Sequence, residues 1–297
     1  MMAYTYTAVK AGLGAIVMAI FSWWRRKEDT ACEEDPATLT STSARVVRTA
    51  DGHDAILRVI ATRLEGRDQL HVWRTLATPP YALLSDNHTL PMLREIQVGH
   101  VSLGMFPLVS QPVDELYGCW AKSSVGDVLD VIAQALEALS FIHELGVAHR
   151  DAFKRNFVME WYSESLLTGA VPVCRPRVYI IDFEMAIQYA PECPASERTC
   201  VGPPCPSDAA TNYAAQRAPE VDGDQAYSPF KLDIWQLGAS FQDFDSTLPA
   251  VQCLLADMVA QDPSERPTAA AALRRLRDLL ANTPPGALLT APIVLNT

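Results

Sequence analysis

Short apolar runs and turn residues fill the first half of the patterned part of the chain. Strand-like stretches lie at 45–48 and 55–60, and an Asp-Gly pair at 51–52 separates them, which is a strong signal for a β-hairpin. Residues 68–76 have apolar side chains at helical spacing, and strand-like stretches return at 89–109. This part is therefore predicted to be a small, strand-rich unit with one helix.

A helical pattern dominates the rest of the chain. After Gly126 apolar residues recur every three or four positions up to Gly146, and glycine is the expected residue just past the end of a helix. Short apolar runs at 157–160 and 178–181 predict two strands, and helical spacing continues from there to residue 280. A strand-rich part followed by a larger helical part predicts a two-lobed α+β fold.

The chain is expected to carry one folded domain between two segments of different composition. The predicted parts are an apolar segment at 1–27, an acidic linker rich in Ser and Thr at 28–43, the domain at 44–281 and a tail at 282–297. Within the domain, the strand-rich lobe is expected at about 44–109 and the helical lobe at about 110–281.

Composition and charge exclude some classes of protein. Hydrophobic residues make up 49% of the chain and charged residues 20%, which excludes global disorder. Lys and Arg number 24 against 35 Asp and Glu, a net charge of −11, so we expect basic partners and no nucleic acid. The 7 cysteines are too scattered for a disulfide framework, which fits a reducing compartment such as the cytoplasm.

The N-terminal segment has a run of uncharged residues at 11–24, followed directly by Arg25, Arg26 and Lys27. The run is shorter than the roughly 20 residues that a spanning helix needs, although an extension across one lysine to 3–24 reaches that length. The basic triplet would then hold the following domain on the cytoplasmic side of a membrane. The sequence leaves open whether the segment associates with a membrane or is a leader that docks on the protein itself.

Two carboxylates and one amide form a candidate site for a divalent cation. Asp151 and Asn156 lie five residues apart after the predicted long helix, and Asp182 ends a predicted strand. Magnesium prefers a few hard oxygen ligands together with waters and substrate phosphates, which such a cluster can supply. A carboxylate that does not bind the metal could accept a proton from an attacking hydroxyl.

Five motifs occur in the order found in protein kinases, and together they are much more specific than any one of them. They are His149-Arg150-Asp151 with Asn156, Asp182-Phe183-Glu184, Ala218-Pro219-Glu220, and the segments 233–238 and 262–267. Over residues 149–267 the chain therefore resembles the protein kinase superfamily, and its long loop insertions are similar to those of divergent fungal-type members. The resemblance implies a bilobal protein-kinase-like fold.

The same resemblance assigns roles in a transfer of the γ-phosphoryl group of ATP to a protein hydroxyl. It implies that Asp151 is the catalytic base and that Asn156 and Asp182 bind Mg²⁺ and the nucleotide phosphates. Lys154 and Arg155 are the candidates for the cation that accompanies the base, because Phe153 stands where the family has lysine.

The small lobe departs from the family pattern. Arg58 stands where the family has the lysine that grips the phosphates, and an arginine fork is not equivalent to an ammonium group. Asp68 and Gln69 stand where a glutamate is expected, which leaves an Arg58–Asp68 pair open. The glycine-rich phosphate loop is absent, since Gly52 is the only glycine between residues 28 and 57. Val109 is the candidate for a backbone contact to adenine.

The resemblance also implies structural roles in the helical lobe. Glu220 and Arg266 are expected to form a buried ion pair, and Asp233 is expected to hold the catalytic loop through its backbone. The segment between the second and third motifs contains five hydroxyl side chains that are candidates for phosphorylation, Ser196, Thr199, Ser207, Thr211 and Tyr213.

Two functions remain open from sequence alone. Intact Asp151, Asn156 and Asp182 favour an active protein kinase that acts on a protein substrate. The altered small lobe, Phe153, and Glu184 in place of glycine favour a pseudokinase, a nucleotide-binding or partner-binding signalling module without catalysis.

Overall fold

A computed structural model of the protein describes residues 44–63, 65–109, 111–118, 124–160, 175–204 and 215–295, all of which lie in one compact unit, Ser41–Thr297. The predicted apolar segment 1–27 with its candidate membrane segment 3–24, and the linker 28–43, lie outside the described residues. So do Ser207, Thr211 and Tyr213. Across the ranges that are described, no helix is both long and apolar enough to cross a membrane.

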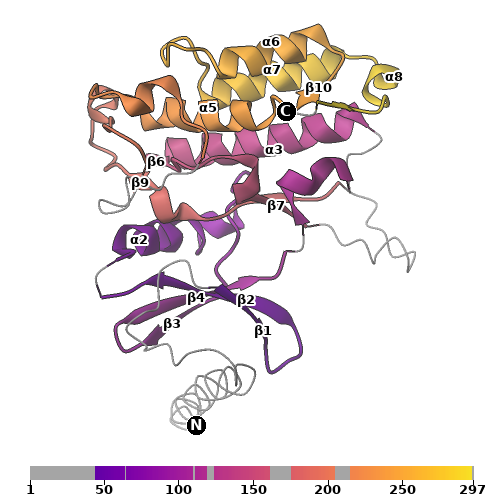
Figure 1. Ribbon diagram of the computed structural model, residues 1–297. Helices are drawn as coiled ribbons and strands as arrows, with labels where there is room; N and C mark the ends of the chain where they lie inside the picture. The colour runs from indigo at the N-terminus through magenta and orange to yellow at the C-terminus, as the bar shows by residue number, and fades with distance from the viewer. Residues whose placement is uncertain are drawn as a thin grey trace, which may run out of the picture. The chain divides into compact units, whose positions relative to one another are not determined.

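The strand-rich lobe contains an antiparallel sheet of four strands in the order β1-β2-β4-β3 (Figure 1). The strands are β1 (Ala44–Arg48), β2 (Asp54–Ala61), β3 (Arg94–Val98) and β4 (Val101–Pro107). The predicted hairpin is confirmed: β1 and β2 pair from Ala44 opposite Arg58 to Arg48 opposite Asp54. Gly52 in the turn has φ 89, a left-handed conformation that glycine adopts without a steric cost.

The helix α2 (Arg67–Leu76) lies against the sheet (Figure 1), as its apolar spacing predicts. Its buried face includes Trp73, whose ring packs against Phe106 of β4 at a centroid distance of 4.6 Å. The same ring meets Phe183 edge-on at 5.0 Å. The helix therefore contacts both the sheet and the segment that follows β8 (Val178–Ile180).

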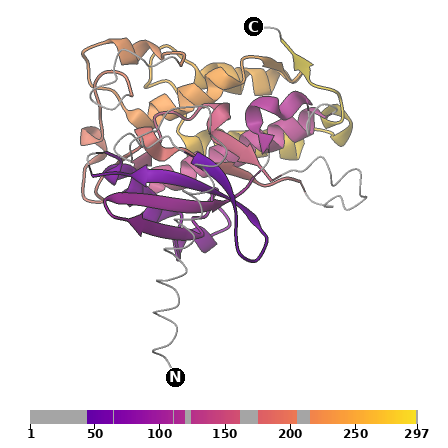
Figure 2. The same ribbon diagram turned by 60° about the horizontal axis from the view of Figure 1, so that its bottom comes forward.

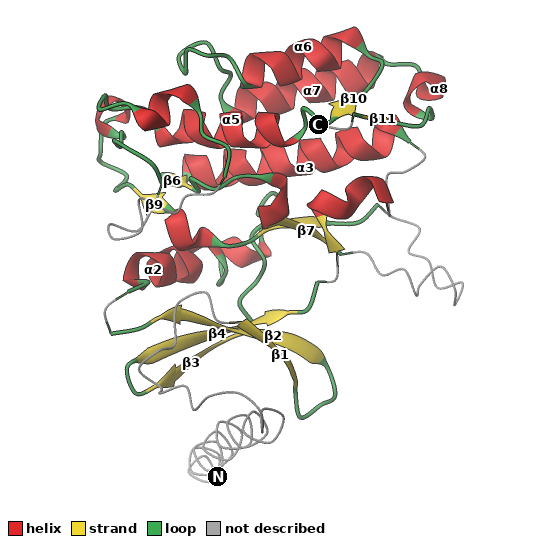
Figure 3. Cartoon of the chain, in the orientation of Figure 1, coloured by secondary structure: helices red, strands yellow, loops and turns green. Residues whose placement is uncertain are grey.

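The second lobe is helical (Figure 3), and it is built around the long predicted helix. The helices are α3 (Val125–Glu144), α5 (Pro229–Ser240), α6 (Pro249–Met258), α7 (Ala269–Asn282) and α8 (Pro285–Leu288). Ser124 caps α3, because its hydroxyl accepts a hydrogen bond from the backbone N–H of Asp127 at 3.3 Å. Ile132, Leu136 and Leu139 of α3 are fully buried, and α7 packs along this helix.

Short strand pairs connect these helices. They are β5 (Gln111–Pro112) with β7 (Phe157–Met159) and β8 (Val178–Ile180), then β6 (Val147–Ala148) with β9 (Ile187–Gln188), and β10 (Phe244–Asp245) with β11 (Ile293–Val294). The predicted strands at 157–160 and 178–181 are thus confirmed as β7 and β8. The pairing of β7 with β8 matters for function, because it places the chain after β8 beside the chain before β7.

The segment after residue 281 contacts the helical lobe. The yellow C-terminal end of the ribbon lies beside the helical lobe (Figure 2). The backbone N–H of Val125 donates to the carbonyl of Thr290 at 2.8 Å, and β11 pairs with β10. The boundary of the domain at residue 281 stays a prediction. The two-lobed α+β architecture that the sequence predicts is confirmed.

Candidate active site

The loop that carries Asp151 follows β6 and is held by one buried carboxylate of α5. Asp233 is fully buried, and its two oxygens accept hydrogen bonds from the backbone N–H groups of His149, at 2.8 Å, and Arg150, at 2.6 Å. The ring of His143 contacts the same carboxylate at 2.8 Å. The expected role of Asp233 is therefore confirmed, and His143 adds a contact that its sequence context did not indicate.

Two further polar residues of α5 hold the same loop. Gln236 accepts a hydrogen bond from the backbone N–H of Ala152 and donates one to the carbonyl of Arg150, both at 2.8 Å. Ser240 accepts one from the backbone N–H of Lys154 at 3.0 Å. Sequence reasoning missed both residues. The signal was available, because residues three and four apart share one face of a helix and a polar stripe on a buried helix needs partners.

Asp151 and Asn156 contact each other directly. The side-chain nitrogen of Asn156 donates to Oδ2 of Asp151 and to its backbone carbonyl, both at 2.7 Å. Arg155 donates to the other carboxylate oxygen of Asp151 at 2.6 Å. Charge-assisted hydrogen bonds of this length orient a carboxylate firmly. The loop therefore presents Asp151 in a fixed position.

Asp182 lies beside this pair because β7 and β8 are neighbours. The backbone N–H of Ile181 donates to the carbonyl of Asn156 at 2.9 Å, and the ring of His149 contacts the carbonyl of Ile181 at 2.9 Å. Asp182 itself has φ 66 and ψ 66, a left-handed conformation. Such a conformation costs a residue other than glycine about 1–3 kcal/mol and is found mainly at functional sites.

Two side-chain oxygens of these residues are of the kind that binds a divalent cation. Within the described ranges, Oδ1 of Asn156 and Oδ2 of Asp182 accept no hydrogen bond. Amide and carboxylate oxygens are the ligands that magnesium prefers. No group of three His, Cys, Asp or Glu side chains in the described part of the chain is arranged to hold a metal. A cation here would therefore depend on phosphate oxygens and water for its other ligands.

Arg58 reaches this site from β2. Its guanidinium donates to Oδ1 of Asp182 at 2.7 Å and lies 3.7 Å from Oε2 of Glu184. The Arg58–Asp68 pair that the sequence left open is not formed, because Asp68 lies on the exposed face of α2. Gln69 is buried instead, and both of its amide atoms lack a hydrogen-bond partner among the residues described.

Lys154 does not contact Asp151. Its ammonium group forms an ion pair with Asp243 and lies 5.3 Å from the centre of the Tyr117 ring. The Tyr117 hydroxyl donates to Asp243 at 3.0 Å, and burial together with the charge of Asp243 raises the pKa of Tyr117. Of the two candidate cations, the one that meets Asp151 is Arg155.

Phe153 and Val109 belong to apolar surroundings. Phe153 is buried in a cluster with Ala218 and Trp235, and the guanidinium of Arg155 lies 4.7 Å above its ring. Val109 follows β4 and packs against the main core, in the link from the strand-rich lobe to β5. The role of Val109 in binding adenine stays a prediction.

The expected ion pair between Glu220 and Arg266 is confirmed. Two nitrogens of Arg266 donate to the two oxygens of Glu220 at 2.6 and 2.8 Å. The side chain of Arg266 is completely buried and that of Glu220 is 9% exposed. This pair fixes the segment before α5 to the loop before α7.

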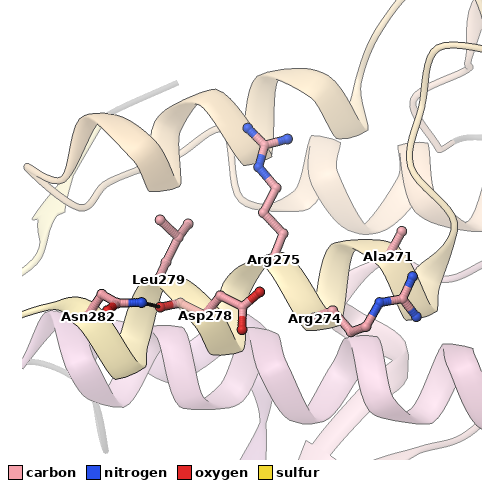
Figure 4. A pocket seen from close by; sticks show the side chains of 6 residues that line it. All are labelled: Ala271, Arg274, Arg275, Asp278, Leu279 and Asn282. Atoms are coloured by element: carbon pink, nitrogen blue, oxygen red, sulfur yellow. Dashed lines mark hydrogen bonds between the residues drawn. The ribbon is translucent and has the colours of Figure 1, made fainter.

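A pocket of about 430 Å³ lies elsewhere, on α7 (Figure 4). Its lining residues are Ala271, Arg274, Arg275, Asp278, Leu279 and Asn282. None of them belongs to the candidate site, so this pocket has no part in the chemistry discussed below.

Comparison with known proteins gives limited similarity to one kinase. The chain matches no protein-family model. It is 30% identical over 112 residues to a protein described as a probable casein kinase II subunit alpha homolog of Encephalitozoon cuniculi (strain GB-M1). The match covers 38% of this chain and 28% of the length of that relative. The similarity supports a protein-kinase-like relationship.

Proposed function

We propose that the protein is a protein-kinase-like phosphotransferase that moves the γ-phosphoryl group of ATP to a hydroxyl group of a protein. The convergence of Asp151, Asn156 and Asp182 carries this proposal. Asp151 is held by Asn156 and Arg155, and within the described ranges one side-chain oxygen each of Asn156 and Asp182 accepts no hydrogen bond. The partial similarity to a casein kinase II alpha homolog supports the same class of reaction.

Each residue has a role that follows from its position. Asp151 accepts the proton of the acceptor hydroxyl while the hydroxyl oxygen forms a bond to the γ-phosphorus. The bond between that phosphorus and the bridging oxygen of ADP breaks at the same time. Arg155 keeps the Asp151 carboxylate oriented through its 2.6 Å contact. Asn156 and Asp182 would hold Mg²⁺, which supplies positive charge to the phosphate oxygens when it is bound.

A second function is favoured by the pairing of Arg58 with Asp182. A carboxylate already bound to a guanidinium at 2.7 Å is a weaker metal ligand than a free one. The alternative is a pseudokinase, in which the retained site binds nucleotide or stays empty and the protein signals through a protein partner.

Nucleotide binding by the full chain tests the proposal. We expect ATP with Mg²⁺ to raise the melting temperature, because a ligand that binds only the native state stabilises it by RT ln(1 + [L]/Kd). An Asp182→Asn variant should give a smaller shift, because it removes a carboxylate from the candidate nucleotide site. An Asp222→Asn variant is the matched control, since Asp222 pairs with Arg217 at the surface. No shift at millimolar ATP would overturn the proposal and favour the partner-binding alternative.

A further inference from the structure

Arg58 places a permanent positive charge at the carboxylate that is the candidate metal ligand. Only 15% of its side chain is exposed, against 32% for Asp182 and 20% for Glu184. An ion pair at 2.7 Å in such partly desolvated surroundings is much less screened than one at the surface. The guanidinium therefore neutralises much of the charge with which Asp182 would attract a cation.

The surroundings of Arg58 leave it no other carboxylate. Within the described ranges its ion pairs are with Asp182 and Glu184 alone. The nearby helix α2 presents Gln69 on its buried face, and a neutral amide does not compete with a carboxylate for a guanidinium. The Nε atom of Arg58 is buried and lacks a partner in the described part of the chain, so the side chain is incompletely satisfied where it stands.

A guanidinium and a divalent cation cannot both bind one carboxylate at full strength, because the two positive charges repel each other over a few ångströms. Arginine stays protonated at every accessible pH, so it cannot relieve this repulsion by losing its charge. Either the cation stays weakly bound or Arg58 leaves Asp182. An arginine at this place can also donate to phosphate oxygens, because its planar guanidinium offers two parallel N–H donors that match the spacing of those oxygens.

We propose that Arg58 is an internal counter-ion that takes the place of a divalent cation at Asp182, so that the protein binds nucleoside triphosphate with little dependence on metal. Binding of a metal to Asp182 requires Arg58 to move away. This inference rests on the proposed function, because it concerns the same nucleotide site.

Binding of Mn²⁺ alone tests this arrangement without nucleotide. Free Mn²⁺ is measured by electron paramagnetic resonance during titration of the full chain and of an Arg58→Gln variant. We expect the variant to bind at least one Mn²⁺ about tenfold more tightly than the native chain, because a positive charge beside the ligand has been removed. Equal affinity in the two proteins would overturn the inference.

A matched control separates the local pair from the net charge of the protein. Arg74→Gln changes the net charge by the same amount, but Arg74 pairs with Glu95 on the exposed side of α2. It should leave the Mn²⁺ affinity within about twofold of the native value, since exposed charges are screened. Equal tightening by Arg74→Gln and Arg58→Gln would contradict a specific role for Arg58.

Nucleotide affinity gives a second test that needs no variant. For the native chain we expect the ATP dissociation constants in EDTA and in Mn²⁺ to agree within about threefold. A metal effect of tenfold or more in the native chain would overturn the inference and leave the proposed function standing. Absence of ATP binding under both conditions would overturn the proposed function, and the Mn²⁺ titrations would then decide the role of Arg58.

Discussion

The candidate site is held differently from its two sides. On the helical side, Asp233 is completely buried and accepts three hydrogen bonds, from His149, Arg150 and His143. On the strand side, one ion pair connects Arg58 to the half-buried Asp182. On the helical side the buried Asp233 carboxylate is fully engaged, although Nε of Arg150 in the loop lacks a partner in the described ranges. On the strand side Nε of Arg58 lacks one as well, and the carboxylate that Arg58 contacts is partly exposed.

This difference indicates which part of the site is structural and which part can change. Buried polar networks that are fully paired are rigid and costly to break, whereas a partly exposed pair can exchange with solvent or ligand. We infer that the helical lobe keeps the loop of Asp151 in shape whether or not the protein is catalytic. Whether Asp182 is paired with a guanidinium, in contrast, depends on Arg58 of the strand-rich lobe.

The largest expected effect concerns the buried pair of the helical lobe. A Glu220→Ala variant leaves the completely buried Arg266 without its carboxylate. Removal of one partner from a buried pair costs about 3–5 kcal/mol in the free energy of unfolding. Urea unfolding followed by circular dichroism measures the loss. The control is Asp222→Ala, which removes an exposed pair and should cost less than about 1 kcal/mol.

A smaller effect is expected at Asp233. In an Asp233→Asn variant an NH₂ group replaces one carboxylate oxygen, and an NH₂ group cannot accept a hydrogen bond. At least one of the donors that now contact Asp233, the N–H groups of His149 and Arg150 or the ring of His143, therefore loses its acceptor. Loss of hydrogen bonds to a charged acceptor costs about 1.5–3 kcal/mol each, so we expect a loss of stability of about 2–3 kcal/mol. Hydrogen exchange at the amides of His149 and Arg150 should become faster. Unchanged exchange there would contradict the view that Asp233 holds the loop.

The pH dependence of stability gives a third prediction. His88 is buried, its Nδ1 contacts the carbonyl of Val178 at 2.7 Å, and its Nε2 lies 3.3 Å from Glu137. Burial lowers the pKa of His88, and the nearby charge of Arg177 lowers it further, against the opposing effects of the carbonyl and of Glu137. Folding therefore favours the neutral ring. Its contribution to stability is complete above about pH 6.5 and decreases as the pH falls toward the lower native value.

Urea unfolding at about pH 7.5 and about pH 5.5 checks this prediction. We expect the native chain to lose more stability than a His88→Gln variant over this interval. The same loss in both proteins would show that other groups cause the acid sensitivity.

The smallest effect is expected at the surface of the strand-rich lobe. Arg74→Ala removes a two-point contact with Glu95, at 2.6 and 2.9 Å, in which Arg74 is largely exposed. Exposed pairs contribute about 0.2–1 kcal/mol, and we expect a loss in this range that decreases further in high salt. A loss above about 2 kcal/mol would mean that α2 contributes more to stability than its contacts indicate.

Sequence patterns predict the parts of this protein that depend on local spacing. The hairpin of β1 and β2 and the helix α3 follow from turn residues and periodicity. The pairing of Glu220 with Arg266, 46 positions apart, was indicated only by the resemblance to protein kinases. The partner of Arg58 follows from neither, because Asp182 is 124 positions away and competes with Asp68, which is nearer in sequence. Whether Arg58 can pair with Asp68 depends on which face of α2 is buried.

The position of Lys154 likewise shows that sequence patterns do not predict contacts between residues far apart in the chain. The motif makes this lysine a candidate partner of the catalytic base, but its side chain lies in a pocket of aromatic rings beside Asp243. The side-chain partner of Lys154, Asp243, is 89 positions away, so no local pattern identifies it. Of the three polar residues of α5 that bind the loop backbone, the resemblance indicated only Asp233, although their spacing on one helix face was a usable signal for the other two.

Transfer of labelled phosphate tests the central claim most directly. The full chain is incubated with radiolabelled ATP, Mg²⁺ and a set of basic proteins as acceptors, beside an Asp151→Asn variant whose melting temperature is checked. Loss of a general base costs about 10²–10⁴-fold in rate, so we predict transfer by the native chain and a loss of at least about a hundredfold in the variant. Equal transfer by the two proteins, or none by the native chain to itself or to any acceptor, would contradict the proposed role of Asp151.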